Sequence, residues 1–256
     1  TTGVFSLLYN LAESTRRGRA NITAKIHPGI AGLMGVFMVV LMGNIDGMVQ
    51  LLQNLFRLIF TDIPLASFDF WRSSRMIPAG ESTGYAITEF PFFTFLFGDL
   101  HSHLISIPFT LLTLALLLTL FLNIRNGSSA FSRIPDLVVI GFSIGALRVI
   151  NMWDYPTYLI ITLLVITIGE FGRITDERKY KFLKIAVQII LVSVASSLFF
   201  KPFLDNYKSF SNGIFLSNWQ TPLYSYLAIH SLFLFVVLTF LGIGLFQLYQ
   251  MGKLRN

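Results

Sequence analysis

Long apolar runs separated by short polar segments dominate the chain. They cover residues 26–44, 104–122, 137–150, 155–169, 185–200 and 224–249. An α-helix rises about 1.5 Å per residue and a bilayer core is about 30 Å thick, so a span needs about 20 residues. The pattern therefore predicts an all-α, polytopic membrane helical bundle with six full spans. The third, fourth and fifth runs are short, so polar residues must complete their ends.

Two further segments have helical patterns without being full spans. Residues 4–11 are apolar but run directly into a basic segment, and the chain does not begin with Met. They look like a partial N-terminal helix, so we expect residues 1–256 to be a single transmembrane domain within a longer chain. Residues 48–60 place polar side chains between apolar ones at helical spacing, which is typical of an interfacial helix in a long outward loop. A helix packed on the other spans would show the same pattern.

Composition and charge agree with a membrane protein. The chain is 54% hydrophobic and 12% charged, whereas a soluble domain is about a quarter charged. The absence of cysteine excludes disulfides, thiolate metal sites and a cysteine nucleophile. The net charge of +6 does not indicate nucleic acid, because in membrane proteins the placement of charge matters more than its sum. The expected partner is a lipid bilayer.

The placement of the basic residues predicts the orientation. Segments 13–25, 123–136, 170–184 and 251–256 together hold 13 of the 19 Lys and Arg but 5 of the 13 Asp and Glu. Cytoplasmic loops are enriched in Lys and Arg, so these four segments are predicted to be cytoplasmic. We expect a multi-pass protein of the cell membrane whose functional loops lie on the extracytoplasmic side.

One outward segment carries a group of acids and histidines at the start of the run that begins at residue 104. It contains Glu89, Asp99, His101 and His103. Charges near lipid usually face a cavity, and carboxylate with imidazole suits a divalent metal such as Mg²⁺ or Mn²⁺, or a phosphate. Asp99, His101 and His103 are therefore candidate metal ligands, and Asp99 and Glu89 are candidate catalytic acids. Asp99 capping a helix that starts at Leu100 is the alternative.

Two other outward segments combine arginine with aromatic residues. Arg72 and Arg75 lie in Phe-Asp-Phe-Trp-Arg-Ser-Ser-Arg at 68–75, where they could hold a lipid-linked phosphate, or could anchor the chain at the interface. Arg148, Trp153 and Asp154 lie at a hairpin tip, where they could bind the substrate or its phosphate. Alternatively, Arg148 and Asp154 form a structural pair that closes the turn.

The remaining candidates are weaker. His230 in the last run either faces the cavity or packs against a neighbour. Asp46, in Gly-Asn-Ile-Asp-Gly at 43–47, has the pattern of a helix terminus. The sequence has no Walker loop, no dinucleotide-binding glycine fingerprint, no zinc-protease motif and no serine elbow. An enzyme of this sequence would therefore use a substrate that is activated elsewhere.

These motifs resemble a known family. Residues 43–47, 68–75, 89–103, 151–157 and 221–230 are similar, in the same order, to motifs of the YYY or DUF2298 family of archaeal and Chloroflexi multispanning membrane proteins. That family resembles the GT-C membrane glycosyltransferases, which use polyprenyl-phosphate sugars at the outer face. The resemblance implies an essential acid in a first outward loop, which would precede Thr1.

The resemblance also implies roles for particular residues. Asp99, His101 and His103 become candidates for the metal or phosphate site, and Glu89 for a further acid. The arginines of the outward segments become candidates for the lipid phosphate: Arg72, Arg75 and Arg148.

Two function classes follow. One is a GT-C-like glycosyltransferase core that uses a polyprenyl-phosphate-linked sugar. The other is a non-catalytic structural or accessory subunit of a larger membrane complex, with its aromatic outer layer used for contacts. A transporter comes third, because the polar outer groups have few counterparts in the cytoplasmic half of the spans.

Overall fold

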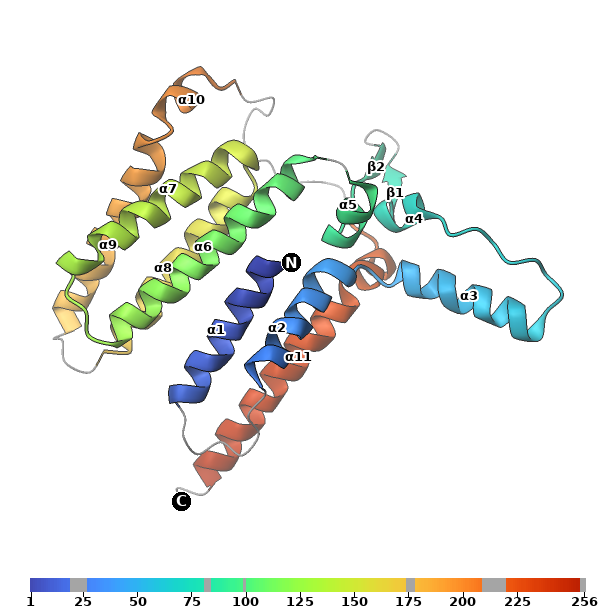
Figure 1. Cartoon of the computed structure of the whole chain (residues 1–256), viewed down its shortest axis with the longest axis horizontal. Coiled ribbons are helices and arrows are strands. Elements are labelled where there is room, and N and C mark those ends of the chain that lie inside the picture. Colours follow the sequence, from blue (N-terminus) through green and yellow to red (C-terminus); the bar gives the residue numbers. More distant parts are fainter. Residues whose placement is uncertain (19–26, 81–83, 99, 174–177, 209–219, 254–256) are drawn as a thin grey trace. The chain divides into compact units, whose positions relative to one another are not determined.

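The computed structural model describes residues 1–18, 27–80, 84–98, 100–173, 178–208 and 220–253 (Figure 1). The chain forms two compact units. Unit 1 comprises Thr1–Val39 and Asp99–Gly213, and unit 2 comprises Val40–Gly98 and Ile214–Asn256. Each unit therefore combines segments that are far apart in the sequence.

Within its described residues, the regular elements of unit 1 are all helices. Its elements are α1 (Thr2–Gly18), α2 (Pro28–Val36), α6 (Ser102–Arg125), the short 3₁₀ helix η2 (Phe131–Arg133), α7 (Ile134–Ile150), α8 (Asp154–Phe171), α9 (Arg178–Leu198) and α10 (Lys201–Asn206). A π-helical turn, η1 (Phe37–Leu41), follows α2 and crosses the boundary into unit 2. The partial helix predicted at residues 4–11 is confirmed as α1, which is longer than the pattern indicated.

Helix α7 provides the centre of the unit 1 core. Its buried apolar side chains pack against α6, α8 and α9, and the cluster consists of Leu117, Leu120, Ile124, Leu137, Ile140, Ile144, Ile166 and Val192. The hydroxyls of Thr113 on α6 and Ser143 on α7 also lie 2.7 Å apart in a buried hydrogen bond. Apolar packing and a satisfied polar contact thus hold the same pair of helices together.

Two glycines let α7 and α9 approach closely. A Cβ atom at Gly145 would lie 2.5 Å from the carbonyl oxygen of Ser196, and one at Gly141 would lie 2.8 Å from that of Val192. Residues four apart share one face of a helix, and small residues on such a face let the backbones of membrane helices come together. No larger residue fits at either position without moving α9.

Unit 2 is built around one long helix and a compact polar region. Its elements are α3 (Asp46–Phe60), α4 (Phe70–Ser74), β1 (Ile77–Gly80), β2 (Gly84–Ala86), α5 (Pro91–Phe97) and α11 (Leu223–Lys253). The two strands pair antiparallel, with Ile77 opposite Ala86. This small sheet was not predicted from the sequence, because strands of three and four residues are too short to produce a recognisable alternation. The helix predicted at residues 48–60 is confirmed as α3.

Four helices are long and apolar enough to cross a membrane within the described part of the chain: Ser102–Arg125, Asp154–Phe171, Tyr180–Leu198 and Leu223–Gln250. The number rises to five if Pro28–Leu41 and Asp46–Phe60 are counted together as one broken span. The prediction of six full spans is therefore wrong, although the all-α membrane class is confirmed.

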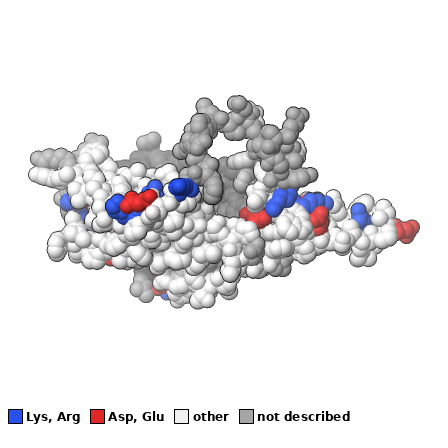
Figure 2. All heavy atoms as spheres, turned by 90° about the horizontal axis from the view of Figure 1, so that it is seen from above, with Lys and Arg blue, Asp and Glu red and all other residues white. Residues whose placement is uncertain are grey.

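Length explains the difference in span number. Helix α7 has 17 residues, which corresponds to about 25 Å and falls short of a bilayer core of about 30 Å. The first apolar run gives a helix of 9 residues before the π-helical turn. Figure 2 shows one face of the molecule, on which uncharged residues form most of the described surface. A surface of this kind suits a protein that is surrounded by lipid.

Candidate functional site

Asp46 is the centre of a polar cluster in unit 2 that also contains Gln50, Arg72 and Ser73, here called the Asp46 cluster. The Nε and Nη2 atoms of Arg72 each lie 2.8 Å from Asp46 Oδ1. Asp46 Oδ2 accepts hydrogen bonds from Ser73 Oγ at 2.8 Å and from Gln50 Nε2 at 2.7 Å. Asp46 is buried, with 7% exposure, so the carboxylate exchanges its water for four protein donor contacts.

Local sequence explains how the cluster forms. Asp46 and Gln50 are four residues apart on α3 and therefore lie on one face. Asn44 Oδ1 accepts from the backbone N–H of Asp46, and Asn44 Nδ2 donates to the carbonyl of Ser73 at 2.6 Å. Asp69 caps α4 by accepting from the backbone N–H of Arg72 at 3.1 Å. These contacts fix the start of α3 beside the helix that carries Arg72.

The cluster keeps Asp46 ionised. Burial alone would raise the pKa of Asp46, but hydrogen bonds from Arg72, Gln50 and Ser73 outweigh burial and hold the pKa below its ordinary value. The position of Asp46 in the first turn of α3 adds to this, because the N-terminus of a helix favours negative charge. Asp46 is therefore an anion at neutral pH, and it positions the Arg72 guanidinium.

Arg75 and Glu89 form a second ion pair in unit 2. Arg75 Nη1 lies 3.0 Å from Glu89 Oε1 and also donates to the carbonyl of Ser74 at 2.9 Å. The two side chains are 27% and 11% exposed. Glu89 was predicted as a catalytic acid, and the structure places its carboxylate in an ion pair with Arg75.

Three aromatic side chains lie beside these arginines and are here called the aromatic group: Trp71, Phe93 and Phe97. The ring centroid of Trp71 is 5.8 Å from that of Phe93 and 5.3 Å from that of Phe97. The Arg75 guanidinium lies 5.5 Å from the Trp71 ring centroid. Trp71 is 52% exposed and the Arg72 side chain is 46% exposed. The Trp71 ring and the neighbouring Arg72 guanidinium are therefore both accessible to a ligand.

The histidines predicted as metal ligands lie in unit 1. His101 is the N-cap residue of α6, and its ring centroid is 5.4 Å from that of His103. Asp99 lies outside the described residues. Helix α6 begins at Ser102, so the alternative in which a helix starts at Leu100 is wrong; Gly98, in the left-handed conformation, instead ends α5. No group of three His, Asp or Glu side chains within the described residues is placed to hold a metal.

The predicted residues of the tip at 148–156 have contacts of their own in unit 1. The Arg148 guanidinium lies 5.0 Å from the ring centroid of Tyr155, and Asp154 Oδ2 accepts from Asn151 Nδ2 at 3.1 Å. The structure thus places Arg148 on an aromatic face, and not in the ion pair with Asp154 that the sequence allowed. Trp153 is 83% exposed. In unit 2, His230 lies on α11 with its ring 4.8 Å from that of Tyr226.

The candidates therefore separate into two sets. Unit 2 contains Arg72, Arg75, Glu89 and His230, and unit 1 contains His101, His103, Arg148, Trp153 and Asp154. Within unit 2 the structure brings Arg72, Arg75 and Glu89 into one polar region, together with Asp46. The sequence pattern predicted Asp46 only as a helix terminus, although an acid four residues before a glutamine, at a break between apolar helices, was a usable signal.

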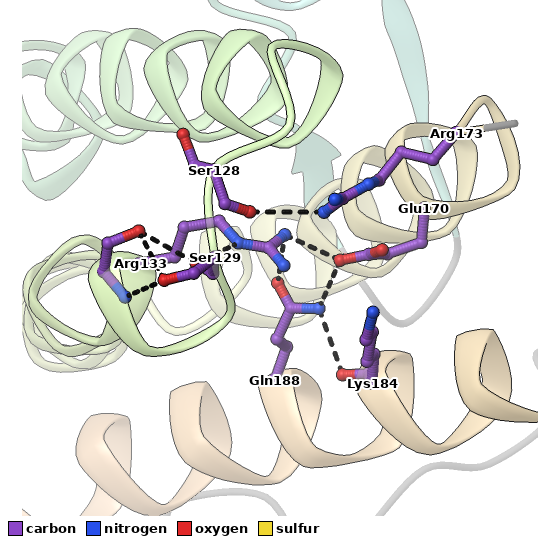
Figure 3. Close-up of polar contacts among 8 residues, drawn as sticks. Ser128, Ser129, Arg133, Glu170, Arg173, Lys184 and Gln188 are labelled. Carbon is purple, nitrogen blue, oxygen red and sulfur yellow. Dashed lines mark hydrogen bonds and ion pairs between the residues drawn. The ribbon is translucent and has the colours of Figure 1, made fainter. Parts of the chain in front are cut away.

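Sequence reasoning also missed a buried network in unit 1 (Figure 3). Arg133 Nη1 lies 2.6 Å from Glu170 Oε1, and Gln188 Nε2 donates to the same oxygen at 2.9 Å. Arg133 is 1% exposed, Glu170 0% and Gln188 3%. The sequence did contain a signal for this network, because Arg133 and Glu170 each flank an apolar run and the polar Gln188 interrupts one.

Long apolar helices joined by short polar segments define the chain as a polytopic α-helical membrane protein. The model of the family described as "Uncharacterized membrane protein (DUF2298)" matches residues 1–255, so the chain belongs to the DUF2298 family. Comparison with curated proteins found no match, and comparison with solved structures found none either. The predicted family membership is therefore confirmed, and the likeness to GT-C enzymes stays a prediction.

Proposed function

We propose that unit 2 binds the phosphate of a polyprenyl-phosphate-linked sugar, and that the protein is the membrane core of a GT-C-like glycosyltransferase. The proposal rests on the fixed orientation and the exposure of the Arg72 side chain. Its guanidinium is held in place by the buried Asp46 carboxylate, yet the side chain remains 46% exposed. A planar guanidinium in a fixed orientation recognises phosphate oxygens through its fork of donors.

The surroundings of Arg72 suit the rest of such a substrate. In the aromatic group, Trp71 is adjacent to Arg72 in the sequence, and Phe93 and Phe97 lie on α5. The faces of these rings can contact a sugar ring or the first isoprene units. Phe90, which precedes α5, stacks on Phe233 of α11 with centroids 5.5 Å apart. The aromatic group is thus connected to a membrane span, where the lipid tail of the donor would lie.

The transfer step can be written with residues of this chain. The acceptor hydroxyl forms a bond to the anomeric carbon, and the bond from that carbon to the phosphate oxygen breaks. Polyprenyl phosphate leaves with the electron pair, and the hydroxyl proton passes to a carboxylate. Asp99 is the proposed base, because Glu89 is paired with Arg75. The predicted divalent metal at Asp99, His101 and His103 stays a prediction, and the step does not depend on it.

Binding of the donor tests the first half of the proposal. The intact protein in lipid nanodiscs is titrated with a polyprenyl-phosphate sugar, and the bound fraction is read by native mass spectrometry. Arg72→Lys keeps a charge beside Asp46 but removes the fork, and we expect affinity to fall at least about tenfold, in line with the roughly 1.5–3 kcal/mol typical of hydrogen bonds to charged groups. Arg57→Gln on α3 is the matched control and should bind normally. Unchanged binding by Arg72→Lys would contradict the phosphate assignment.

Transfer of the sugar tests the second half. Asp99→Asn should abolish transfer by the intact protein while leaving donor binding unchanged, because asparagine keeps the size of the side chain but cannot accept the proton. His103→Ala should reduce transfer less. Normal transfer by Asp99→Asn would defeat the catalytic assignment even if the donor binds.

A second candidate function is an accessory subunit of a larger membrane complex. It is favoured by the ion pairs of two acids of unit 2, since Asp46 and Glu89 are each paired with an arginine. If the protein is an accessory subunit, Asp99→Asn should not change the activity of the complex. Arg72 variants should then lose co-purifying subunits without any change in lipid binding.

A further inference from the structure

Helix α3 has an unusually complete division into an apolar and a polar side. At 100° per residue, its apolar residues occupy one continuous arc, and Asp46, Gln50, Gln53, Asn54 and Arg57 occupy the other. Most side chains of the apolar arc are at least half exposed: Met48, Leu51, Leu52, Leu55, Phe56, Leu58, Ile59 and Phe60. Within the described residues of unit 2, the apolar arc of α3 is therefore not packed against another element.

The polar side of α3 already has a partner. Residues 61–69 form a return segment that runs back along this side. The carboxamides of Gln50 and Asn54 each form a pair of hydrogen bonds with the backbone of one residue in the return segment. Gln50 donates to the carbonyl of Asp69 at 2.9 Å and accepts from its N–H at 2.8 Å. Asn54 donates to the carbonyl of Ala66 at 2.8 Å and accepts from its N–H at 2.9 Å. The four bonds fix the rotation of α3 and leave its apolar arc uncovered within unit 2.

The start of α3 is fixed at one end of a membrane span. The backbone N–H of Ile45 donates to the carbonyl of Ala228, five residues into α11, at 3.1 Å. The span Leu223–Gln250 has 28 residues and is about 42 Å long, which exceeds a bilayer core of about 30 Å. A helix of this length extends beyond the hydrocarbon core, and α3 starts beside its Leu223 end and extends away from it (Figure 1).

We propose that α3 lies in the plane of the membrane surface with its apolar arc inserted among the lipids, and that the return segment covers its aqueous side. The occupant of the apolar arc is lipid, because the arc starts beside the Leu223 end of a candidate span that is longer than the bilayer core. Segment 46–69 carries one basic residue, Arg57, and three acids, so attraction to anionic lipid does not drive the insertion. This inference is independent of the proposed function.

Fluorescence from single cysteines tests the insertion. The chain contains no cysteine, so Leu55→Cys and Gln53→Cys can each carry one environment-sensitive probe in the intact, reconstituted protein. Leu55 lies near the middle of the apolar arc, and Gln53 is an exposed residue of the polar side two positions away. We expect lipids with nitroxide-labelled acyl chains to quench the Leu55 probe at least about threefold more than the Gln53 probe, because an interfacial helix buries its apolar face at the headgroup boundary. Aqueous iodide should quench them in the opposite order.

Lipid composition separates apolar insertion from electrostatic attraction. Quenching of the Leu55 probe should be the same in phosphatidylcholine vesicles and in vesicles that also contain phosphatidylglycerol. Iodide quenching of the Leu55 probe would place the arc in water, and protection from both quenchers would place it against protein; either result overturns the proposal. The pair Ile59→Cys and Arg57→Cys repeats the comparison if a Leu55 variant does not fold.

Discussion

Arg133 and Glu170 form an ion pair of 2.6 Å whose two side chains are 1% and 0% exposed. The residues are 37 positions apart, on η2 and α8, and Gln188 of α9 donates to the same Glu170 oxygen. Arg133 Nη2 and Glu170 Oε2 have no hydrogen-bond partner within the described part of the chain. The pair and Gln188 thus connect three helical elements. Removal of one charge would leave the other buried without a counter-charge.

Glu170→Gln should destabilise the protein by about 3–5 kcal/mol, because it leaves the buried Arg133 guanidinium without a counter-charge. The free energy of unfolding in detergent, from denaturant titration followed by circular dichroism, measures the change. Glu13→Gln breaks the more exposed Glu13–Arg16 pair and is the matched control, with an expected cost of at most about 1 kcal/mol. Replacing Arg133 and Glu170 together by methionine should cost less than Glu170→Gln alone. Equal stability of wild type and Glu170→Gln would contradict the structural role.

Asp46 should make the stability of unit 2 dependent on pH in acid. Its folded pKa lies below the ordinary value of 3.8, so its contribution is present in full above that value and is lost as the pH falls toward the folded pKa. Asp46→Asn should remove this contribution and flatten the stability profile below about pH 4. Unfolding midpoints measured at a series of acidic pH values test this, and profiles of equal slope in the two proteins would refute it.

Gly145→Ala should disturb the packing of α7 on α9. The added Cβ would lie 2.5 Å from the Ser196 carbonyl oxygen, so the helices must separate, and we expect a loss of about 1–3 kcal/mol. Gly242→Ala in α11 is the control, because a Cβ there meets no atom within 4 Å. It should stabilise slightly, by about 0.5–1 kcal/mol, since alanine favours a helix over glycine. Thermal unfolding of the two variants under the same conditions measures both effects, and similar midpoints would argue against the close α7–α9 contact.

The distribution of basic residues predicts that Arg16 and Arg125 face the cytoplasm and that Asp154 and Asp205 face outward. Arg125→Cys and Asp205→Cys allow a direct measurement with a membrane-impermeant thiol reagent, because the chain has no other cysteine. In intact cells the reagent should label position 205 and not position 125. Labelling of both positions only after permeabilisation, or of both before it, would reject this orientation.

The sequence by itself determined the class of the protein and most of its helices. Apolar runs reflect local burial in lipid, so the all-α membrane class and α6, α8, α9 and α11 followed from composition and spacing. Helix α3 followed from its periodicity. The number of spans did not, because helix ends depend on the residues that complete each turn, and α7 ends after 17 residues.

The tertiary structure decided which polar residues meet. The sequence identified Arg72, Arg75 and Glu89 as important, but only the fold paired Arg75 with Glu89 and placed Arg72 on Asp46, 26 residues earlier. The Arg133–Glu170 pair depends likewise on three elements that pack together. Hydrophobic periodicity is a local property that a sequence displays directly, whereas the partner of a charge is set by the long-range packing that brings distant helices side by side.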